Sequence, residues 1–145
     1  MLPNFNQQGF LPEGVWDCDL AEFVKTFAVF RRSDRRLVLF EKLESFLKET
    51  LATGWVQEII IDGSFVTKKD EPDDIDIILA LFPAFDEAEV SFWTGKLLDE
   101  KHLSKKYRFD VKVRKFGSPK YFEWLDFFQE VKDSNERKGV VRLKQ

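Results

Sequence analysis

The sequence predicts an α/β (α+β) protein in which a small mixed β-sheet carries helices packed mainly on one face. Short runs of β-branched and aliphatic residues alternate with segments whose apolar residues recur at the helical period. The expected order is helices, two strands, a helix, a strand and a helix, which suits such a layered fold. With 145 residues, 43% of them hydrophobic and 15% aromatic, the chain can build one sizeable core. We therefore expect a single domain over 1–145, with 1–14 as an extended arm.

The first helices are predicted from capping residues and apolar stripes. Asp19 is expected to cap a short helix, and a longer helix is expected to begin near Ser33 or Asp34 and to stop at Gly54. The apolar stripe of the longer helix consists of Leu37, Phe40, Leu43, Leu47 and Leu51. The arginines near its start, expected on a solvated face, are Arg31, Arg32, Arg35 and Arg36.

The later segments alternate strands with helices. A helix is expected over 86–104, because acidic residues occupy its first turn and basic residues its last, as the helix dipole favours. Ser118 followed by Pro119 is a typical start of another helix. The expected strands cover 56–61, 75–81, 107–114 and 139–143.

Composition and charge exclude several classes of protein. Charged residues make up 34% of the chain and leave a net charge of -3, which argues against a general nucleic-acid coat protein. The single cysteine, Cys18, cannot form an intrachain disulfide, so a reducing cytoplasm is the expected compartment. We expect no signal peptide, no membrane span and no zinc site, because the residues that each of them needs are lacking.

Two aspartates, Asp74 and Asp76, begin the expected strand over 75–81. Side chains two residues apart on a strand point to the same face, so both carboxylates project together from an otherwise apolar element. Without a cation they repel each other, and one of them is expected to have a raised pKa. Carboxylate oxygens suit Mg²⁺, which usually keeps water ligands and also binds substrate phosphates.

Asp110 is the third candidate, on the polar side of the strand expected over 107–114. If this strand neighbours the one with Asp74 and Asp76, all three carboxylates converge. Such a trio can hold two metal ions roughly 3.5–4 Å apart, which clamp the attacking and leaving oxygens of an in-line displacement. Asp110 would also be the natural base for an acceptor hydroxyl. Asp74, Asp76 and Asp110 are thus the candidate catalytic and metal-binding residues.

A phosphate site is expected just after the strand over 56–61. Gly63 lets backbone N–H groups approach a phosphate without a Cβ in the way, and Ser64 adds a hydroxyl donor. If a helical turn begins at Phe65, its free N–H groups would form an anion site. A lysine a few residues later would neutralise phosphate charge. The candidate nucleotide-binding residues are Gly63, Ser64, Thr67 and Lys68.

Each of these signals alone also has an ordinary structural explanation. Gly-Ser after a strand is common in turns, Asp-x-Asp before a strand is often a solvated cap, and a lone Asp on a polar strand face is usually just exposed. The ordered combination of a strand, Gly-Ser, a nine-residue spacer, Asp-Ile-Asp and a later strand with one Asp is far more specific than any part.

This combination resembles the signature of the DNA polymerase beta-like nucleotidyltransferase superfamily. The residues that match the signature are Gly63, Ser64, Asp74, Asp76 and Asp110. The segment 63–67, Gly-Ser-Phe-Val-Thr, looks like a minimal branch of that superfamily associated with toxins and antitoxins. Further elements of this branch are matched by 11–14, 124–129 and 138–140, so that the resemblance spans most of the chain.

The resemblance implies a Mg²⁺-dependent enzyme with a nucleoside triphosphate (NTP) as substrate. Gly63 and Ser64 would hold the triphosphate, and Asp74 and Asp76 would bind both metal ions. Asp110 would bind the catalytic metal and help to activate the acceptor. A nucleotidyl group would then move to a hydroxyl group, with release of pyrophosphate.

The acceptor is expected to be a macromolecule, either a partner toxin protein or an RNA, because the signature and its flanking helices use nearly the whole chain. Two alternatives stay open. One is an antitoxin-like binding module that acts by contact with a partner toxin. The other is a small-molecule nucleotidyltransferase of the aminoglycoside type, for which a dimer would supply the missing acceptor wall.

Overall fold

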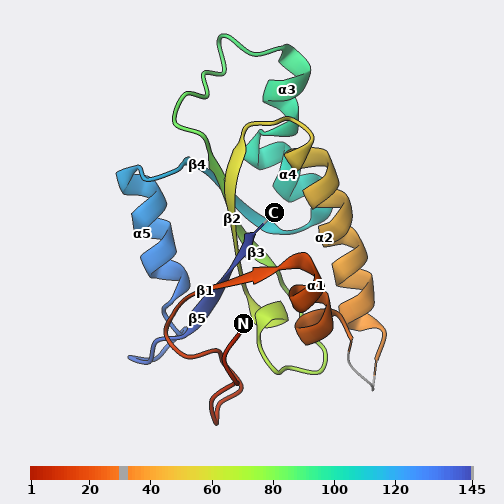
Figure 1. The fold of residues 1–145 in the computed structure, drawn as a ribbon, viewed down its shortest axis with the longest axis vertical. Coiled ribbons are helices and arrows are strands. Elements are labelled where there is room, and N and C mark those ends of the chain that lie inside the picture. Colours follow the sequence, from red (N-terminus) through yellow and green to blue (C-terminus); the bar gives the residue numbers. More distant parts are fainter. Residues whose placement is uncertain (30–32, 145) are drawn as a thin grey trace.

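The structure, a computed structural model, describes residues 1–29 and 33–144, and its centre is one five-stranded mixed sheet (Figure 1). The strands are β1 (Gly14–Asp19), β2 (Val56–Asp62), β3 (Asp76–Leu81), β4 (Asp110–Lys115) and β5 (Gly139–Lys144). Their order across the sheet is β1-β5-β2-β3-β4. β1 is parallel to β5 and β3 is parallel to β4, whereas β2 is antiparallel to both of its neighbours.

Helices cover both faces of the sheet, unequally. In Figure 1, α1, α2 and α4 lie on one side of the strands and α5 lies alone on the other. The helical elements are α1 (Leu20–Phe23), the π-helix η1 (Val24–Ala28), α2 (Arg35–Leu51), the 3₁₀ turn η2 (Ser64–Val66), α3 (Phe92–Leu97), α4 (Glu100–Tyr107) and α5 (Pro119–Phe128). The predicted fold class, a mixed sheet with helices mainly on one face, is confirmed.

The alternation of β2 and β3 divides the core between the two faces. Ile59 and Ile61 point into the larger cluster with the phenylalanines of α1, η1 and α2, while Ile60 points to the smaller cluster under α5. Ile78 of β3 shares that smaller cluster with Tyr121. Both faces are therefore apolar in the middle of the sheet, which explains the continuous Ile and Leu run in these strands.

The structure differs from the prediction at three elements. The helix expected over 86–104 is two short helices, because Ser91 and Asp99 each cap a separate one with a side-chain oxygen. The strand expected from residue 107 begins only at Asp110, since Arg108 ends α4 in the left-handed conformation (φ 57°). The strand β1 was not expected, because its half-buried edge position gives no clear alternation.

The helix α2 buries Phe40, Leu43 and Leu47 of the expected stripe but not its first residue. Leu37 is 50% exposed, whereas Arg36 is completely buried. The guanidinium of Arg36 donates to the carbonyl oxygens of Phe27, Phe65, Thr67 and Lys69 at 2.6–3.0 Å. The expectation of a solvated basic face is therefore wrong for Arg36, which instead ties the segment after β2 to α2.

The other arginines of this group bear less on the fold. Arg35 is exposed and donates from Nε to the carbonyl oxygen of Pro72. Arg31 and Arg32 lie outside the described residues.

Across 1–29 and 33–144, no helix combines the length and the apolar character needed to cross a lipid bilayer.

Candidate functional site

Strand register aligns three aspartates side by side across the sheet. Asp62 at the end of β2 is the register partner of Asp76 at the start of β3, and Asp76 is the partner of Asp110 at the start of β4. Register partners point to the same face, and neighbouring strands are about 4.8 Å apart. Asp76 alternates with Ile77, so this row lies on the face of Ile78, which α5 covers.

Asp74, two residues before β3, forms hydrogen bonds with the Gly63–Ser64 turn. The N–H group of Ser64 donates to Asp74 Oδ1 at 3.0 Å, and the Ser64 hydroxyl donates to the same oxygen. The N–H groups of Asp73 and Asp74 are 2.9 and 3.2 Å from Ser64 Oγ. These bonds bring together the two halves of the predicted signature, although nine residues of sequence separate them.

Gly63 is required by the backbone at this turn. Its φ is +93° with ψ −179°, a conformation that essentially only glycine adopts. A Cβ built on Gly63 would lie 2.8 Å from the carbonyl oxygen of Asp74. The turn can therefore approach the Asp74 segment this closely only without a side chain at position 63.

Burial and neighbouring negative charge disfavour ionisation of Asp76. Burial, followed by the negative charges of Asp74, Asp62 and Asp110, raises the pKa of Asp76 to about 7. Burial also raises the pKa of Asp62, although the ammonium of Lys138 opposes this effect. Asp74, Asp62 and Asp110 therefore lie near enough to disfavour ionisation of Asp76, as expected for a site that takes up a cation.

Two lysines supply counter-charge within this group. Lys138 Nζ lies 3.0 Å from Asp62 Oδ1, although the geometry does not make Oδ1 a hydrogen-bond acceptor. Lys112 Nζ lies 3.2 Å from Asp110 Oδ1 and 4.5 Å from the ring centroid of Trp124 on α5. Asp110 is thus exposed at the mouth of the site, and Asp62 is buried at its base.

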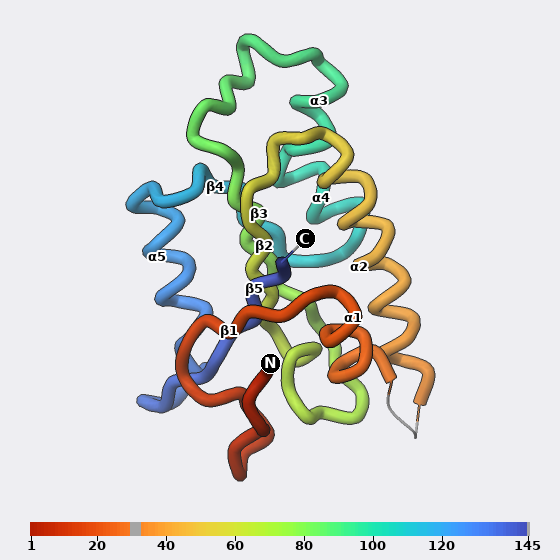
Figure 2. Tube along the Cα trace, in the orientation of Figure 1, coloured from red at the N-terminus to blue at the C-terminus, as the bar shows by residue number. Residues whose placement is uncertain are grey.

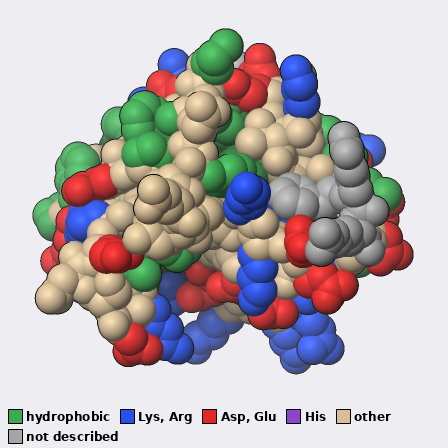
Figure 3. Space-filling view, turned by 90° about the horizontal axis from the view of Figure 1, so that it is seen from below, with side chains coloured by type: hydrophobic (Ala, Val, Ile, Leu, Met, Phe, Trp, Pro, Cys, Tyr) green, Lys and Arg blue, Asp and Glu red, His purple; other side chains and the backbone are tan. Residues whose placement is uncertain are grey.

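The row opens onto a cleft of about 1370 Å³. One wall is the arm at residues 6–10. The N–H group of Lys68 donates to the carbonyl oxygen of Gly9 in this arm at 2.8 Å. In Figure 2 this arm runs close to the segment that follows β2. The opposite wall includes the end of α5 and the connection to β5, with Phe127 and Lys132. Basic and acidic side chains are intermixed at this end of the molecule (Figure 3).

The predicted nucleotide-binding residues all line this cleft, together with Asp74, Asp76 and Asp110. Lys68 is exposed, whereas Thr67 is buried and its hydroxyl donates to the carbonyl oxygen of Ser64 at 2.6 Å. The 3₁₀ turn η2 is present, but the expectation of free N–H groups there is wrong. The N–H groups of Ser64, Phe65 and Val66 donate to Asp74 Oδ1, the Asp74 carbonyl oxygen and the Gly63 carbonyl oxygen.

The donors at this site suit a hard divalent cation. Asp74, Asp76 and Asp110 offer carboxylate oxygens, which Mg²⁺ prefers, and burial together with the neighbouring negative charges raises the pKa of Asp76. As the side chains stand, no three or more His, Cys, Asp or Glu residues of the described chain form a set that could hold a metal ion. Asp74 faces Ser64 and Asp110 faces Lys112, so ligation would require both carboxylates to turn.

Sequence reasoning missed three parts of this site. Asp62 directly precedes Gly63, and its place at the end of an apolar strand was a signal that could have been used. Lys138 belonged to a segment matched only by resemblance, and the arm at 6–10 had no periodic pattern. The contact of Gly9 with Lys68, 59 positions away, brings this arm to the site, and the contact with Asp62, 76 positions away, brings Lys138 to the row.

Comparisons with known proteins identify a family but no activity. No curated protein and no solved structure matches the chain. The model of a family of unknown function, DUF6932, matches residues 3–144, which include every strand and helix described above. The chain therefore belongs to the DUF6932 family.

Proposed function

We propose that this protein is a Mg²⁺-dependent nucleotidyltransferase that moves a nucleotidyl group from an NTP to a hydroxyl group of a protein or RNA acceptor. One observation carries the proposal. The pairs Asp62–Asp76 and Asp76–Asp110 are in register on adjacent strands, next to Asp74 and the Gly63 turn. An ordinary solvated cap or exposed strand residue would not need this convergence of carboxylates at one end of a cleft.

The volume of the cleft supports a two-substrate reaction. At about 1370 Å³ it exceeds the roughly 300–1,000 Å³ of a typical small-molecule pocket. An NTP on the Gly63 side would leave space toward Phe127 and the arm at residues 6–10 for part of an acceptor. The chain would then form at least part of its own acceptor wall.

Each residue has a role that follows from its position. Asp74 and Asp76, with Asp110, would hold the cation, which when bound would neutralise phosphate charge and orient the leaving group. Asp110 is exposed at the cleft mouth, where an acceptor hydroxyl would arrive, so it would accept the proton of that hydroxyl. The Ser64 hydroxyl would donate a hydrogen bond to a phosphate oxygen once the Asp74 carboxylate turns toward the cation.

The test combines binding with labelling. Mg²⁺ together with one of the four NTPs should raise the melting temperature of the protein, because a ligand that binds only the folded state stabilises it. The variant Asp76→Asn should lose this gain. A candidate acceptor incubated with α-labelled NTP should become labelled, and this labelling should require Mg²⁺ and Asp110.

The outcomes distinguish the proposed enzyme from the alternatives. No thermal shift with any NTP would contradict the proposal. NTP binding without labelling, together with neutralisation of a partner toxin that survives Asp74→Asn, would identify a module that acts by contact. Pyrophosphate release that depends on a small hydroxylated compound would identify a small-molecule nucleotidyltransferase.

A further inference from the structure

Lys138, the residue just before β5, has no role among the catalytic residues proposed above. In the antiparallel pairing of β2 with β5, Ile61 faces Val141, which brings the chain before Gly139 toward the Gly63 turn. Lys138 lines the same cleft as Gly63 and Ser64. Its side chain is only 15% exposed, and Asp62, its partner at 3.0 Å, is 5% exposed.

This ion pair is poorly suited to a purely structural role. Removing an ammonium and a carboxylate from water costs free energy that their attraction repays only with good geometry and further hydrogen bonds. Here Asp62 Oδ1 is buried and makes no hydrogen bond, although the ammonium is nearby. An apolar pair of similar size would stabilise the fold at least as well, so stability alone does not account for Lys138 at this place.

The charges around the cleft indicate what the ammonium does. Asp62, Asp74, Asp76 and Asp110 gather at its base, and a divalent cation held there would leave the triphosphate in need of further positive charge. The other lysines that line the cleft are less well placed for this. Lys69 pairs with Asp73 at 2.9 Å and is half exposed, and Lys68 and Lys132 are exposed.

We propose that Lys138 is a substrate-binding residue whose ammonium, held beside the Gly63–Ser64 turn by Asp62, contacts the phosphates of the NTP. A lysine binds phosphate as a compact point charge and needs no fixed donor plane. Asp62, 3.0 Å from the ammonium, keeps it in the cleft before substrate arrives. This inference rests on the proposed function and adds a fifth functional side chain, from the residue just before β5.

The test separates phosphate binding from folding. Lys138→Met should weaken binding of the NTP found for the wild type, and of inorganic tripolyphosphate, by about 10- to 100-fold in the presence of Mg²⁺. Binding of the corresponding nucleoside should change by less than about 3-fold, and Lys138→Arg should restore most of the phosphate affinity. Lys132→Met, at an exposed lysine of the same cleft, is the matched control and should have little effect.

Several results would overturn the inference. Equal losses for nucleoside and triphosphate would indicate a structural role, and equal losses in Lys138→Met and Lys132→Met would indicate a general charge effect. Unchanged tripolyphosphate affinity in Lys138→Met, with NTP binding by the wild type intact, would refute the role of Lys138 alone. A wild type that binds no NTP would refute the proposed function as well. If Lys138→Met does not fold, Lys138→Gln replaces it in the same comparison.

Discussion

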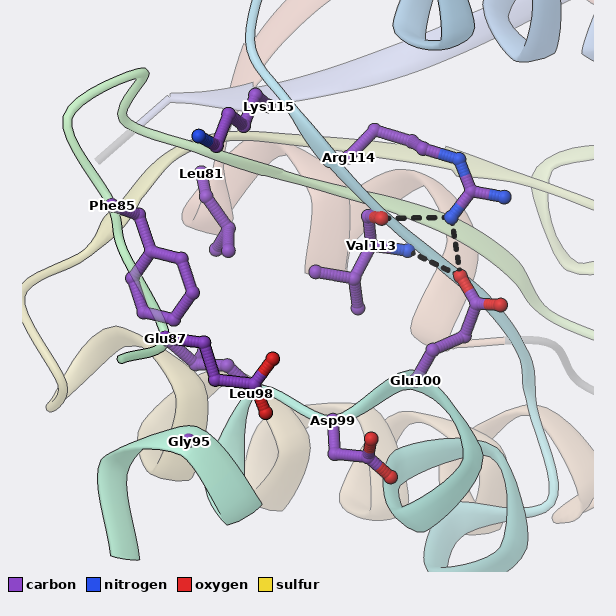
Figure 4. A pocket seen from close by; sticks show the side chains of 10 residues that line it. All are labelled: Leu81, Phe85, Glu87, Gly95, Leu98, Asp99, Glu100, Val113, Arg114 and Lys115. Carbon is purple, nitrogen blue, oxygen red and sulfur yellow. Dashed lines mark hydrogen bonds and ion pairs between the residues drawn. The ribbon is translucent and has the colours of Figure 1, made fainter. Parts of the chain in front are cut away.

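The carboxylates at the two ends of the paired strands β3 and β4 have opposite electrostatic surroundings. At the end where both strands finish, Glu100 Oε1 accepts from the N–H group of Val113 at 2.8 Å and from Arg114 Nη1 at 2.6 Å (Figure 4). At the end where both strands start, Asp76 lies among three further aspartates, and its pKa is raised to about 7. The charge of the Glu100 carboxylate is paired with that of Arg114, whereas the Asp76 carboxylate is surrounded by like charges.

The cavities at the two ends differ accordingly. The one beside Glu100 holds about 230 Å³ and has the apolar side chains of Leu81, Phe85 and Val113 in its lining. The cleft beside Asp76 holds about 1370 Å³. Charged side chains at the end of a sheet therefore do not by themselves indicate a site. The informative feature is a group of like charges that the fold brings together and pairs only in part, next to a space that a ligand can enter.

The largest expected effect comes from the arginine that holds the acidic end together. Arg36→Met should lower the free energy of unfolding by about 3–5 kcal/mol, because it leaves the carbonyl oxygens of Phe65, Thr67 and Lys69, of which the first two are buried, without this donor. Urea unfolding measures this loss. The control Arg35→Met, at an exposed arginine whose Nε donates to Pro72, should cost less than about 1 kcal/mol. Similar losses in both variants would contradict the special role of Arg36.

A smaller effect of opposite sign is expected at the row itself. The folded-state pKa of Asp76, about 7, lies above its ordinary value of 3.8, so the folded state binds the proton more tightly than the unfolded state. This group therefore disfavours folding increasingly as the pH rises from about 4 through 7. In the metal-free protein, Asp76→Asn should stabilise the fold on the order of 2 kcal/mol at pH 7.5 and by almost nothing at pH 4.

Unfolding experiments at both pH values, with a chelator present, test this sign. Asp110→Asn is the matched control, because Asp110 is exposed and pairs with Lys112 at 3.2 Å. It should be neutral or slightly destabilising. An Asp76→Asn variant that is less stable than the wild type at pH 7.5 would show that the row is not crowded by like charge.

The smallest effect is expected at the opposite end. Glu100→Gln keeps an oxygen for the Val113 N–H group but removes the charge that faces Arg114, so stability should fall by about 0.5–1 kcal/mol. Binding of Mg²⁺ and NTP should not change, because Glu100 lies at the other end of β4 from Asp110. Melting temperatures without and with Mg²⁺ and NTP measure the stability of the variant and its ligand binding. If Glu100→Gln no longer gained stability from the ligand, the proposal that only the Asp76 end binds it would be contradicted.

Local patterns in the sequence were enough for much of the architecture. The caps Asp19 and Ser118 accept from N–H groups three residues later, as expected from their types. The expected positions of β2, β3 and β5 agree with the structure within one residue at each end, because these strands are short apolar runs bounded by turn residues. The split between α3 and α4 was missed because the residues of a helix and of a capped break between two helices differ little in composition.

Local reasoning from the amino-acid sequence was enough to identify an Asp-x-Asp segment, a Gly-Ser turn and a later strand with one aspartate. Three facts became visible only in the folded chain: Asp76 lies between Asp62 and Asp110, Lys138 contacts Asp62, and Arg36 is buried. They could not be predicted because strand register and the burial of a charged side chain depend on partners far away in the chain. Neighbouring residues cannot specify such partners, because many pairings satisfy the same local pattern.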